Sequence, residues 1–226
     1  MTGPNGSSGL VGRLVSVNVA TPRTVEWYGR DVRSAIWKTP VEGPVEVRHD
    51  NLAGDDQADR RVHGGVDKAV YAYAVEDYSW WASTSFDSAF GPGTFGENLT
   101  TEGLDLTHAL IGERWQVGSV VLEVCQPRFP CAKLGMKMGD SGFVDLFDEA
   151  RRPGAYLRIV QEGQIETGDP IHRIHQPSHD LRIVDLVEAT RNRAATPALL
   201  NRILDNPHVP TPYIDSATRS LDRQAG

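Results

Sequence analysis

The stretch that decides the fold reads Val120-Val121-Leu122-Glu123-Val124-Cys125, followed by Gln126-Pro127-Arg128-Phe129-Pro130-Cys131-Ala132-Lys133-Leu134. Its first half is an apolar run bounded by turn signals, which predicts a buried β-strand. In its second half, two prolines bracket Arg128 and Phe129. Each proline fixes its own φ and drives the residue before it toward an extended backbone. The sequence therefore predicts a stiff approach from a core strand to Cys131.

Cys131 is the first candidate functional residue, because Arg128 and Lys133 flank it. Neighbouring cations lower the pKa of a thiol, and the thiolate is both the nucleophile and the metal ligand. The alternative is an inert buried cysteine, since free cysteine is among the most buried residue types. Cys125 lies inside the apolar run, so we expect it to pack as a small hydrophobic residue. The intervening prolines argue against a disulfide between the two cysteines.

The composition is that of an ordinary globular protein. The chain has 226 residues, 39% of them hydrophobic and 23% charged, which suits one large domain or one domain with an appendage. A formal net charge of −7 argues against general nucleic-acid binding, although a local basic pocket can still bind a small anion. No apolar run is long enough to span a bilayer. Residues 1–9 lack the features of a secretory signal and predict a disordered leader. We therefore expect a cytoplasmic protein with no nucleic-acid or membrane partner.

Many short apolar segments separated by glycine and proline turns predict a mainly β fold with some helix, either a barrel or a folded sheet. The expected strands include residues 11–19, 41–47, 69–73, 120–125 and 155–160. Short helices are expected over residues 76–81 and 143–151, and the aromatic side chains of the first are expected to be core. We assign residues 10–175 to this β domain.

The pattern changes after this point, and residues 176–226 predict a small three-helix extension. Residues 181–190 carry apolar side chains at helical spacing. Thr196-Pro197 and Thr211-Pro212 each indicate an N-cap followed by a first-turn proline. The extension shows no convincing chemical cluster. Its basic side chains are interpreted as a solvated face: Arg191, Arg193 and Arg202.

A dense polar stretch supplies a second candidate site. His63-Gly64-Gly65-Val66-Asp67-Lys68 places a histidine and a lysine around a glycine pair. Because glycine allows positive φ, backbone N–H groups can approach a ligand closely here, and the two side chains could grip an anion. The alternative is a surface turn with a structural histidine. The six residues together are a stronger signal than the glycine pair alone.

Two further segments are ambiguous when taken alone. Phe95-Gly96-Glu97-Asn98 could place a carboxylate and an amide at a pocket, or could form a tight turn in which these side chains satisfy backbone groups. Residues 29–38 carry several cations together with Ser34 and Lys38. By itself, that segment is better explained as a solvated hairpin with scattered charges.

Four motifs in this order resemble the MOSC domain family, whose members are related to the C-terminal part of molybdenum cofactor sulfurase. They are residues 54–59 (Gly-Asp-Asp-Gln-Ala-Asp), 63–70 (His-Gly-Gly-Val-Asp-Lys-Ala-Val), 95–101 (Phe-Gly-Glu-Asn-Leu-Thr-Thr) and 126–134 (Gln-Pro-Arg-Phe-Pro-Cys-Ala-Lys-Leu). Asp55-Asp56 is a mild departure, because the family pattern leads us to expect Asp-Glu or a similar pair there. The helical tail resembles the extension of the YiiM-type branch of the family.

The resemblance implies a MOSC-type β-barrel that holds a molybdopterin-type molybdenum cofactor in a basic pocket. Cys131 would be the protein ligand of molybdenum, in line with the preference of soft metals for thiolate, or would carry sulfur for it. His63, Glu97 or Asn98 could deliver or orient protons at the substrate, and His63 is the expected catalytic residue because histidine titrates near neutral pH. The residues implied in cofactor binding are Arg33, Ser34, Lys38, Gln57, His63, Gly64, Gly65, Asp67, Lys68, Glu97, Asn98, Arg128 and Lys133.

The activity implied by the resemblance is a molybdenum-cofactor-dependent reduction of N-hydroxylated compounds such as 6-hydroxylaminopurine, which would be a detoxification. Reduction of N–OH to N–H with loss of water takes two electrons. No flavin or iron–sulfur motif is visible in the sequence, so an external electron-donating reductase is implied as a partner. A homodimer is compatible with the sequence.

Two alternative functions stay open. A non-catalytic carrier would bind the cofactor, or would hold sulfur on Cys131 as a persulfide. Pyridoxal phosphate binding is a term of the wider family, but this chain has no pyridoxal-enzyme domain, so a partner would have to supply that sulfur. A cysteine hydrolase would use Cys131 as nucleophile and His63 as base, but the sequence shows no obvious orienting group or oxyanion site.

Overall fold

Strand β10 (Val120–Gln126) is formed by the apolar run described above, and all of its residues except Val121 are buried. It belongs to a computed structural model that describes residues 9–56, 64–84, 90–191 and 195–225. Two antiparallel neighbours flank the strand, β9 (Arg114–Val117) and β11 (Ala155–Gln161). The continuous hydrophobic run in the sequence follows from this central position.

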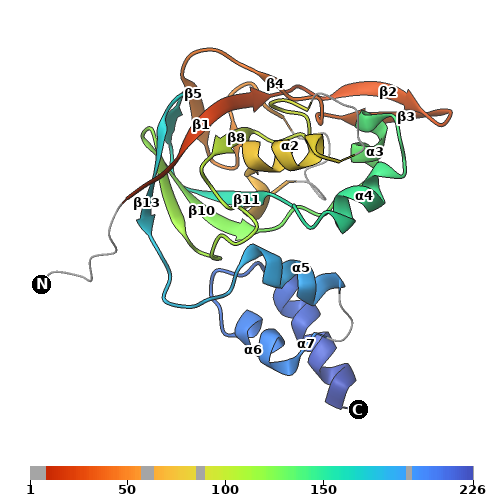
Figure 1. The fold of residues 1–226 in the computed structure, drawn as a ribbon, viewed down its shortest axis with the longest axis vertical. Coiled ribbons are helices and arrows are strands. Elements are labelled where there is room, and N and C mark those ends of the chain that lie inside the picture. The colour runs from red at the N-terminus through yellow and green to blue at the C-terminus, as the bar shows by residue number, and fades with distance from the viewer. Residues whose placement is uncertain (1–8, 57–63, 85–89, 192–194, 226) are drawn as a thin grey trace, which may run out of the picture.

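The strands around β10 close into a barrel (Figure 1). The order in the ring is β13-β9-β10-β11-β7-β8-β1, and β13 pairs back with β1. The parallel pair is β7–β8, and the other pairs of the ring are antiparallel. The remaining ring strands are β1 (Gly9–Val19), β7 (Val70–Ala74), β8 (Leu99–Glu102) and β13 (Pro170–His175). The predicted mainly β barrel is thereby confirmed.

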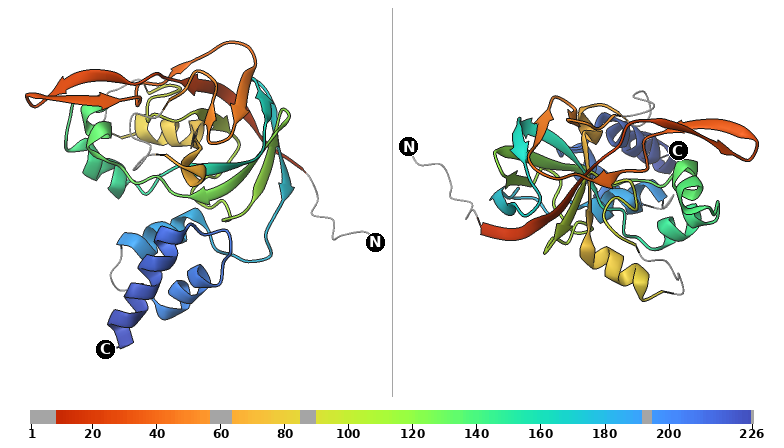
Figure 2. Two further views of the ribbon diagram at one scale, coloured as in Figure 1. Left: turned by 180° about the vertical axis from the view of Figure 1, so that it is seen from behind. Right: turned by 90° about the horizontal axis from the view of Figure 1, so that it is seen from above.

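Shorter strands extend the barrel. β4 (Thr39–Pro40) pairs with β1, while β5 (Val45–Arg48), β6 (Asn51–Leu52) and β12 (Gly163–Ile165) form a separate small sheet. β2 (Arg23–Trp27) and β3 (Arg30–Ser34) form a ribbon that projects from the barrel in each view of Figure 2. The turn at its tip has positive φ at Tyr28 and Gly29, as a two-residue hairpin turn requires. The solvated hairpin expected at residues 29–38 is therefore correct only for its first part, because the ribbon ends at Ser34, which is buried, and the Lys38 side chain is only 9% exposed.

Two hydrophobic clusters stabilise the fold. The larger fills the barrel and continues into the C-terminal helices, with Leu14, Leu122 and Leu157 among its fully buried members. The smaller is mostly aromatic and includes Tyr71, Tyr73, Tyr78, Trp81, Phe95, Leu134, Phe143 and Phe147. Its helical contributors are α2 (Val75–Ala82), α3 (Ala132–Met138) and α4 (Phe143–Glu149). The expected core role of the aromatic residues at 76–81 holds for Tyr78 and Trp81, which are 7% and 3% exposed, whereas Trp80 is only half-buried.

The C-terminal extension consists of α5 (Ile183–Arg191), α6 (Pro197–Leu204) and α7 (Thr211–Ala225), which lie together beside the barrel (Figures 1 and 2). Thr196 caps α6 as predicted, and its hydroxyl accepts a hydrogen bond from the Leu199 amide at 3.3 Å. α7 begins at Thr211 itself, so that threonine is the first helical residue instead of the N-cap. The extension is joined to the barrel by backbone hydrogen bonds such as Ile183 N–H to Ala109 O, at 3.1 Å.

The last ring strand ends at His175 and the first helix of the extension begins at Ile183. The division into residues 10–175 and 176–226 stays an interpretation of the sequence. None of the helices in the described ranges is both long and apolar enough to cross a membrane.

Candidate functional site

A single pocket gathers side chains from several segments that are far apart in the sequence. Its lining runs from residues 34–38 after the ribbon, through β7 and the loop before β8, to residues 128–133 and Tyr156 on β11. The pocket volume is about 110 Å³. The charged residues of this lining are Lys38, Asp55, Asp56, Lys68, Arg128 and Lys133. Cations outnumber carboxylates there, although the whole chain is acidic, so the local field favours an anionic ligand.

Cys131 lies in this pocket at the start of α3, with an extended backbone (φ −135°, ψ 170°) and a partly exposed side chain. A hydrogen bond fixes the start of the segment that leads to Cys131: Gln126 Nε2 donates to Asp67 O at 2.8 Å. Cys125 differs completely: it is fully buried, and burial raises the pKa of its thiol. Cys131 is therefore the accessible thiol of the two, and Cys125 packs in the core as expected.

Arg128 is buried next to Cys131, with only 7% of its surface exposed. Its guanidinium carbon lies 5.2 Å from the Tyr71 ring centroid and 5.5 Å from that of Phe147. Its Nη1 atom has no hydrogen-bond partner among the described residues. Arginine stays charged in proteins, and leaving a buried donor unsatisfied is costly. A group that accepts this hydrogen bond therefore fits the pocket chemically.

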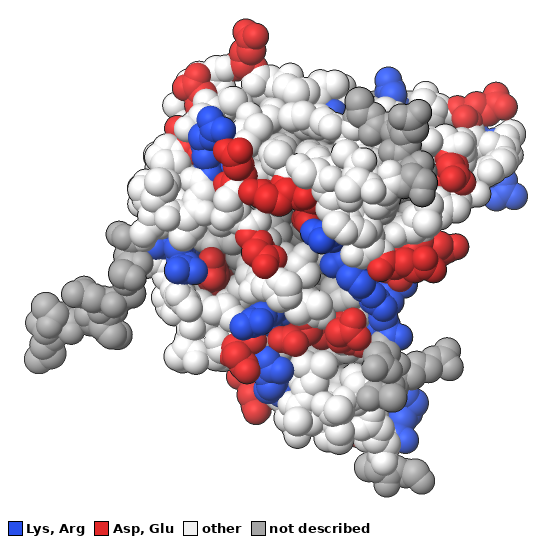
Figure 3. All heavy atoms as spheres, viewed as in Figure 1, with Lys and Arg blue, Asp and Glu red and all other residues white. Residues whose placement is uncertain are grey.

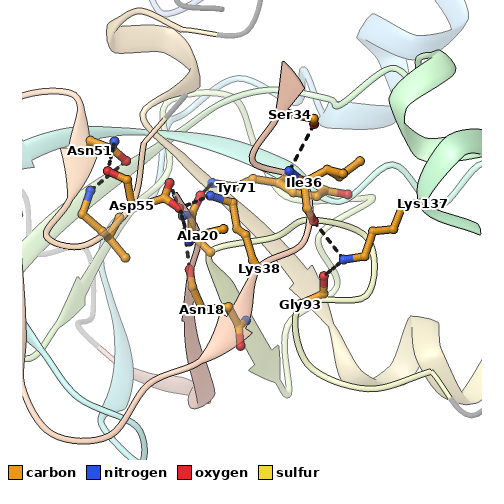
Figure 4. Close-up of polar contacts among 12 residues, drawn as sticks. Asn18, Ala20, Ser34, Ile36, Lys38, Asn51, Asp55, Tyr71, Gly93 and Lys137 are labelled. Carbon is orange, nitrogen blue, oxygen red and sulfur yellow. Dashed lines mark hydrogen bonds and ion pairs between the residues drawn. The ribbon is translucent and has the colours of Figure 1, made fainter. Parts of the chain in front are cut away.

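The opposite wall carries a buried ion pair, drawn in Figure 4. Lys38 donates to Asp55 Oδ1, and the two side chains are 9% and 1% exposed. Asp55 also accepts hydrogen bonds from the Ala20 amide at 2.8 Å and from Asn98 Nδ2 at 3.0 Å. Asn98 Oδ1 in turn accepts from the Tyr71 amide at 3.1 Å. This network fixes the ammonium of Lys38 at the pocket, and burial lowers the pKa of that ammonium despite the nearby carboxylate.

Lys137 connects α3 to the same wall. Figure 4 shows its ammonium between Ile36 and Gly93, donating to Ile36 O at 2.9 Å and to Gly93 O at 2.5 Å. Burial lowers the pKa of Lys137 to about 8. The two acceptor segments are themselves packed tightly, since a Cβ at Gly93 would lie 2.4 Å from Lys38 O. Lys137 therefore links α3 to the segments that contain Ile36 and Gly93.

Two phenols complete the lining. Tyr71 donates to Pro153 O at 2.9 Å, and its ring lies 5.1 Å from that of Tyr156. Burial raises the pKa of both hydroxyls, so both stay protonated at neutral pH. Because Tyr71 donates its only proton to Pro153 O, the Tyr156 hydroxyl is the one of the two that can donate to a ligand beside the cationic side chains.

Comparison with known proteins shows the family to which the chain belongs. Residues 59–172 match the model of the MOSC domain. The uncharacterized protein YflK of Bacillus subtilis is 30% identical over 93% of this chain and 95% of its own length. This chain belongs to the MOSC domain family. The predicted resemblance is therefore confirmed.

Other relatives of this MOSC protein agree. Protein YiiM of Escherichia coli is 31% identical over 68% of this chain and 70% of its own length. A Gibberella moniliformis protein named "Reductase" is 29% identical over 76% of this chain, and the matched region covers 31% of that relative. The crystal structure of YiiM from Geobacillus stearothermophilus superposes with a TM-score of 0.77 at 29% identity, covering 93% of this chain and 99% of that one. The match extends over nearly the whole fold, C-terminal helices included.

The MOSC fold brings together a subset of the residues predicted from sequence. The pocket is lined by Ser34, Lys38, Lys68, Asn98, Arg128, Cys131 and Lys133. Gln57 and His63 lie outside the described residues. Over the described ranges, no group of three or more histidine, cysteine, aspartate or glutamate side chains is placed to hold a metal ion.

Five predicted residues do not line the pocket as described. Arg33 is exposed on β3, and Gly64 and Gly65 precede the short 3-10 helix η1 (Val66–Lys68). Asp67 points to Arg158, with 2.5 Å between its Oδ1 and Arg158 Nε. Glu97 is fully buried beneath the pocket. Each of the two interpretations of residues 95–98 holds for one residue. Glu97 accepts hydrogen bonds from the amides of Gly93 and Phe95, at 2.5 and 3.0 Å, whereas Asn98 lines the pocket.

Sequence reasoning missed Asp55, Tyr71, Tyr156 and Lys137. Asp55 lies within a motif that was quoted, so the motif itself was the available signal. Lys137 follows Lys133 by four residues and therefore lies on the same side of α3. This signal was hidden because no helix was predicted over residues 132–138.

Proposed function

We propose that this protein binds a molybdenum cofactor and reduces N-hydroxylated compounds, with the Cys131 thiolate as the protein ligand of the metal. MOSC domains are associated with this cofactor, and the chain belongs to that family. Similarity to YiiM proteins and to a fungal protein named "Reductase" supports a redox role. The substrate class, exemplified by 6-hydroxylaminopurine, comes from the family resemblance described above.

The observation that carries the proposal is an accessible thiol next to a buried guanidinium with an unsatisfied donor. Cys131 offers soft sulfur, which suits a soft metal centre. Arg128 Nη1 offers a donor without a partner among the described residues, which suits an anionic oxygen of the cofactor. Lys68 and Lys133 lie on the same lining and add positive charge. The donor set therefore fits the group.

The size of the pocket limits how much of the cofactor it can enclose. Its volume of about 110 Å³ lies below the roughly 300–1,000 Å³ of typical ligand pockets. A pocket of this size is too small to enclose a whole pterin cofactor, so part of a bound cofactor would extend beyond it.

Each side chain has a defined task in this proposal. When bound, the cofactor supplies the two-electron chemistry that protein side chains lack. Conversion of N–OH to N–H consumes two electrons and two protons and releases water, so an external reductase must supply the electrons. Arg128 and the lysines would hold anionic groups, while the protonated Tyr156 hydroxyl would donate a hydrogen bond at the pocket surface.

The test is to purify the protein from cells that make the cofactor and to measure molybdenum content and loss of 6-hydroxylaminopurine with a chemical reductant. We expect about one molybdenum per chain and turnover in the wild type, and loss of both in Cys131→Ser. Cys125→Ala is the matched control, since that cysteine is buried away from the pocket, and it should keep both. A Cys131→Ser protein with full metal and activity would end the proposal.

The same preparation tests the carrier alternative. Cys131 is accessible enough to hold a persulfide or to bind the cofactor without turnover. A carrier would bind stoichiometrically but reduce nothing, even with excess reductant. Persulfide on Cys131, detected by mass spectrometry after incubation with a sulfur donor, would favour this function over reduction.

A further inference from the structure

Arg191, the last residue of α5, reaches from the C-terminal extension to the segment that carries Cys131. Its guanidinium carbon lies 4.9 Å from the centroid of the Phe129 ring. The same guanidinium forms an ion pair with Asp148 of α4. Arg191 is an exposed residue, as predicted for a solvated face, but its guanidinium also makes these two contacts, and Arg193 lies outside the described residues. Figure 3 shows basic side chains gathered on the side of the molecule where α4 and α5 approach each other.

Phe129 couples this contact to the pocket. It lines the pocket together with Cys131, two residues further on. Its other side faces a smaller cavity, which is lined in part by Phe147 and by Val187 of α5. Pro130 stands between Phe129 and Cys131 and restricts the backbone there. A shift of the Phe129 ring is therefore transmitted along a stiff segment to the thiol.

Helix α4 contacts both Arg128 and Arg191. Phe147 packs under the guanidinium of Arg128, and its neighbour Asp148 pairs with Arg191. Because Arg128 and Phe129 are consecutive residues, the contact of Arg128 with Phe147 and the contact of Arg191 with Phe129 both act on the segment that leads to Cys131. The extension thus contributes one charged side chain to the support of the Cys131 approach.

We propose that Arg191 is a positioning residue for Cys131, through which the C-terminal extension controls the presentation of the thiol. This deepens the proposed function and rests on it for its catalytic meaning. The contact itself can be tested in cofactor-free protein, so the two ideas can fail separately. A cation–π contact of this kind changes an equilibrium about two- to fivefold.

The experiment measures the alkylation rate of Cys131 by iodoacetamide from pH 6 to pH 10, with each thiol quantified by mass spectrometry. Cys125 is fully buried and serves as an internal reporter of unfolding. For Arg191→Gln, we expect the Cys131 rate to rise about two- to fivefold while the Cys125 rate stays unchanged. Arg191→Lys, which keeps the charge, should restore part of the wild-type rate.

Two controls separate positioning from simple stabilisation. Arg202→Gln removes another arginine of the extension, which pairs with Asp180 and Asp185 at 2.8 and 3.1 Å, and should leave the Cys131 rate unchanged. In a Phe129→Leu background the effect of Arg191→Gln should disappear, since the two act as one unit. An unchanged Cys131 rate in Arg191→Gln would overturn the proposal. An equal effect of Arg191→Gln in the wild-type and Phe129→Leu backgrounds would also overturn it. Should Arg191→Gln not fold, Asp148→Asn tests the same contact from α4 with the same expected rise in rate.

Discussion

Lys38 and Asp55 form an ion pair inside the pocket, where their side chains are only 9% and 1% exposed. The two residues are 17 positions apart in the sequence. Asp55 is held by the Ala20 amide and by Asn98 as well, so the pair fixes one wall of the site before any ligand arrives.

Removing either partner of this pair should destabilise the protein. Breaking a buried ion pair leaves an uncompensated charge, so Lys38→Met is expected to lower the free energy of unfolding by about 3 kcal/mol. Urea denaturation measures this. The matched control is Arg13→Met, which removes an exposed pair with Glu102 (59% and 49% exposed) and should cost less than about 1 kcal/mol. Equal losses in the two variants would contradict the prediction.

Lys137 should make stability depend on pH in the alkaline range. Its pKa is about 8 in the folded protein and 10.5 ordinarily, because burial disfavours the ammonium. Between those values the unfolded chain binds more protons, so the contribution of Lys137 to the free energy of unfolding rises as pH increases. The difference between wild type and Lys137→Met should therefore grow from pH 8 to pH 10 in denaturant titrations. Lys133→Met is the control from the same side of α3, and it should keep the wild-type slope. A difference that is constant across this range would refute the assignment.

Glu97 should prove structural. It accepts hydrogen bonds from the Tyr78 hydroxyl, from the Gly93 and Phe95 amides, and from Thr100 Oγ1. Glu97→Ala would leave these buried donors unsatisfied, and we expect a loss of more than about 3 kcal/mol. Glu102→Ala, on the exposed end of β8, should change stability by less than about 1 kcal/mol. Thermal melts followed by circular dichroism compare the two, and a stable Glu97→Ala protein would restore Glu97 as a candidate ligand-binding residue.

Arg128 should be needed for the cofactor and dispensable for folding. Its buried charge has an unsatisfied donor, and the cost of that donor offsets the cation–π contacts of the guanidinium with Tyr71 and Phe147. For Arg128→Met we expect a free energy of unfolding within about 1 kcal/mol of wild type, and loss of bound molybdenum by elemental analysis. Arg152→Met is the contrasting variant, since Arg152 pairs with Asp77 at 2.5 Å away from the thiol. It should lose stability and keep molybdenum. A strongly destabilised Arg128→Met protein would show that Arg128 is structural.

Much of the architecture could be predicted from local sequence patterns. The apolar run at residues 120–125, the glycine and proline turns and the Thr196 cap each depend on residues close together in the chain, and the structure has the corresponding elements. The helix α3 was missed because its seven residues are flanked by prolines on one side and contain Gly135, both of which argue against helix. Burial of Leu134 in the aromatic cluster overrides that weak local preference.

The sequence alone determined the family, the barrel class and the choice of Cys131 over Cys125, because motif order and hydrophobic pattern are properties of the linear chain. Only the tertiary structure decided which polar side chains share the pocket. Asp55 and Tyr156 reach it from segments 101 residues apart in the sequence (156 − 55), Lys137 binds the Ile36 segment of its wall, and Arg191 reaches the Cys131 segment from the far end of α5. Such encounters follow from strand pairing and helix packing over long separations, and no local spacing rule encodes them.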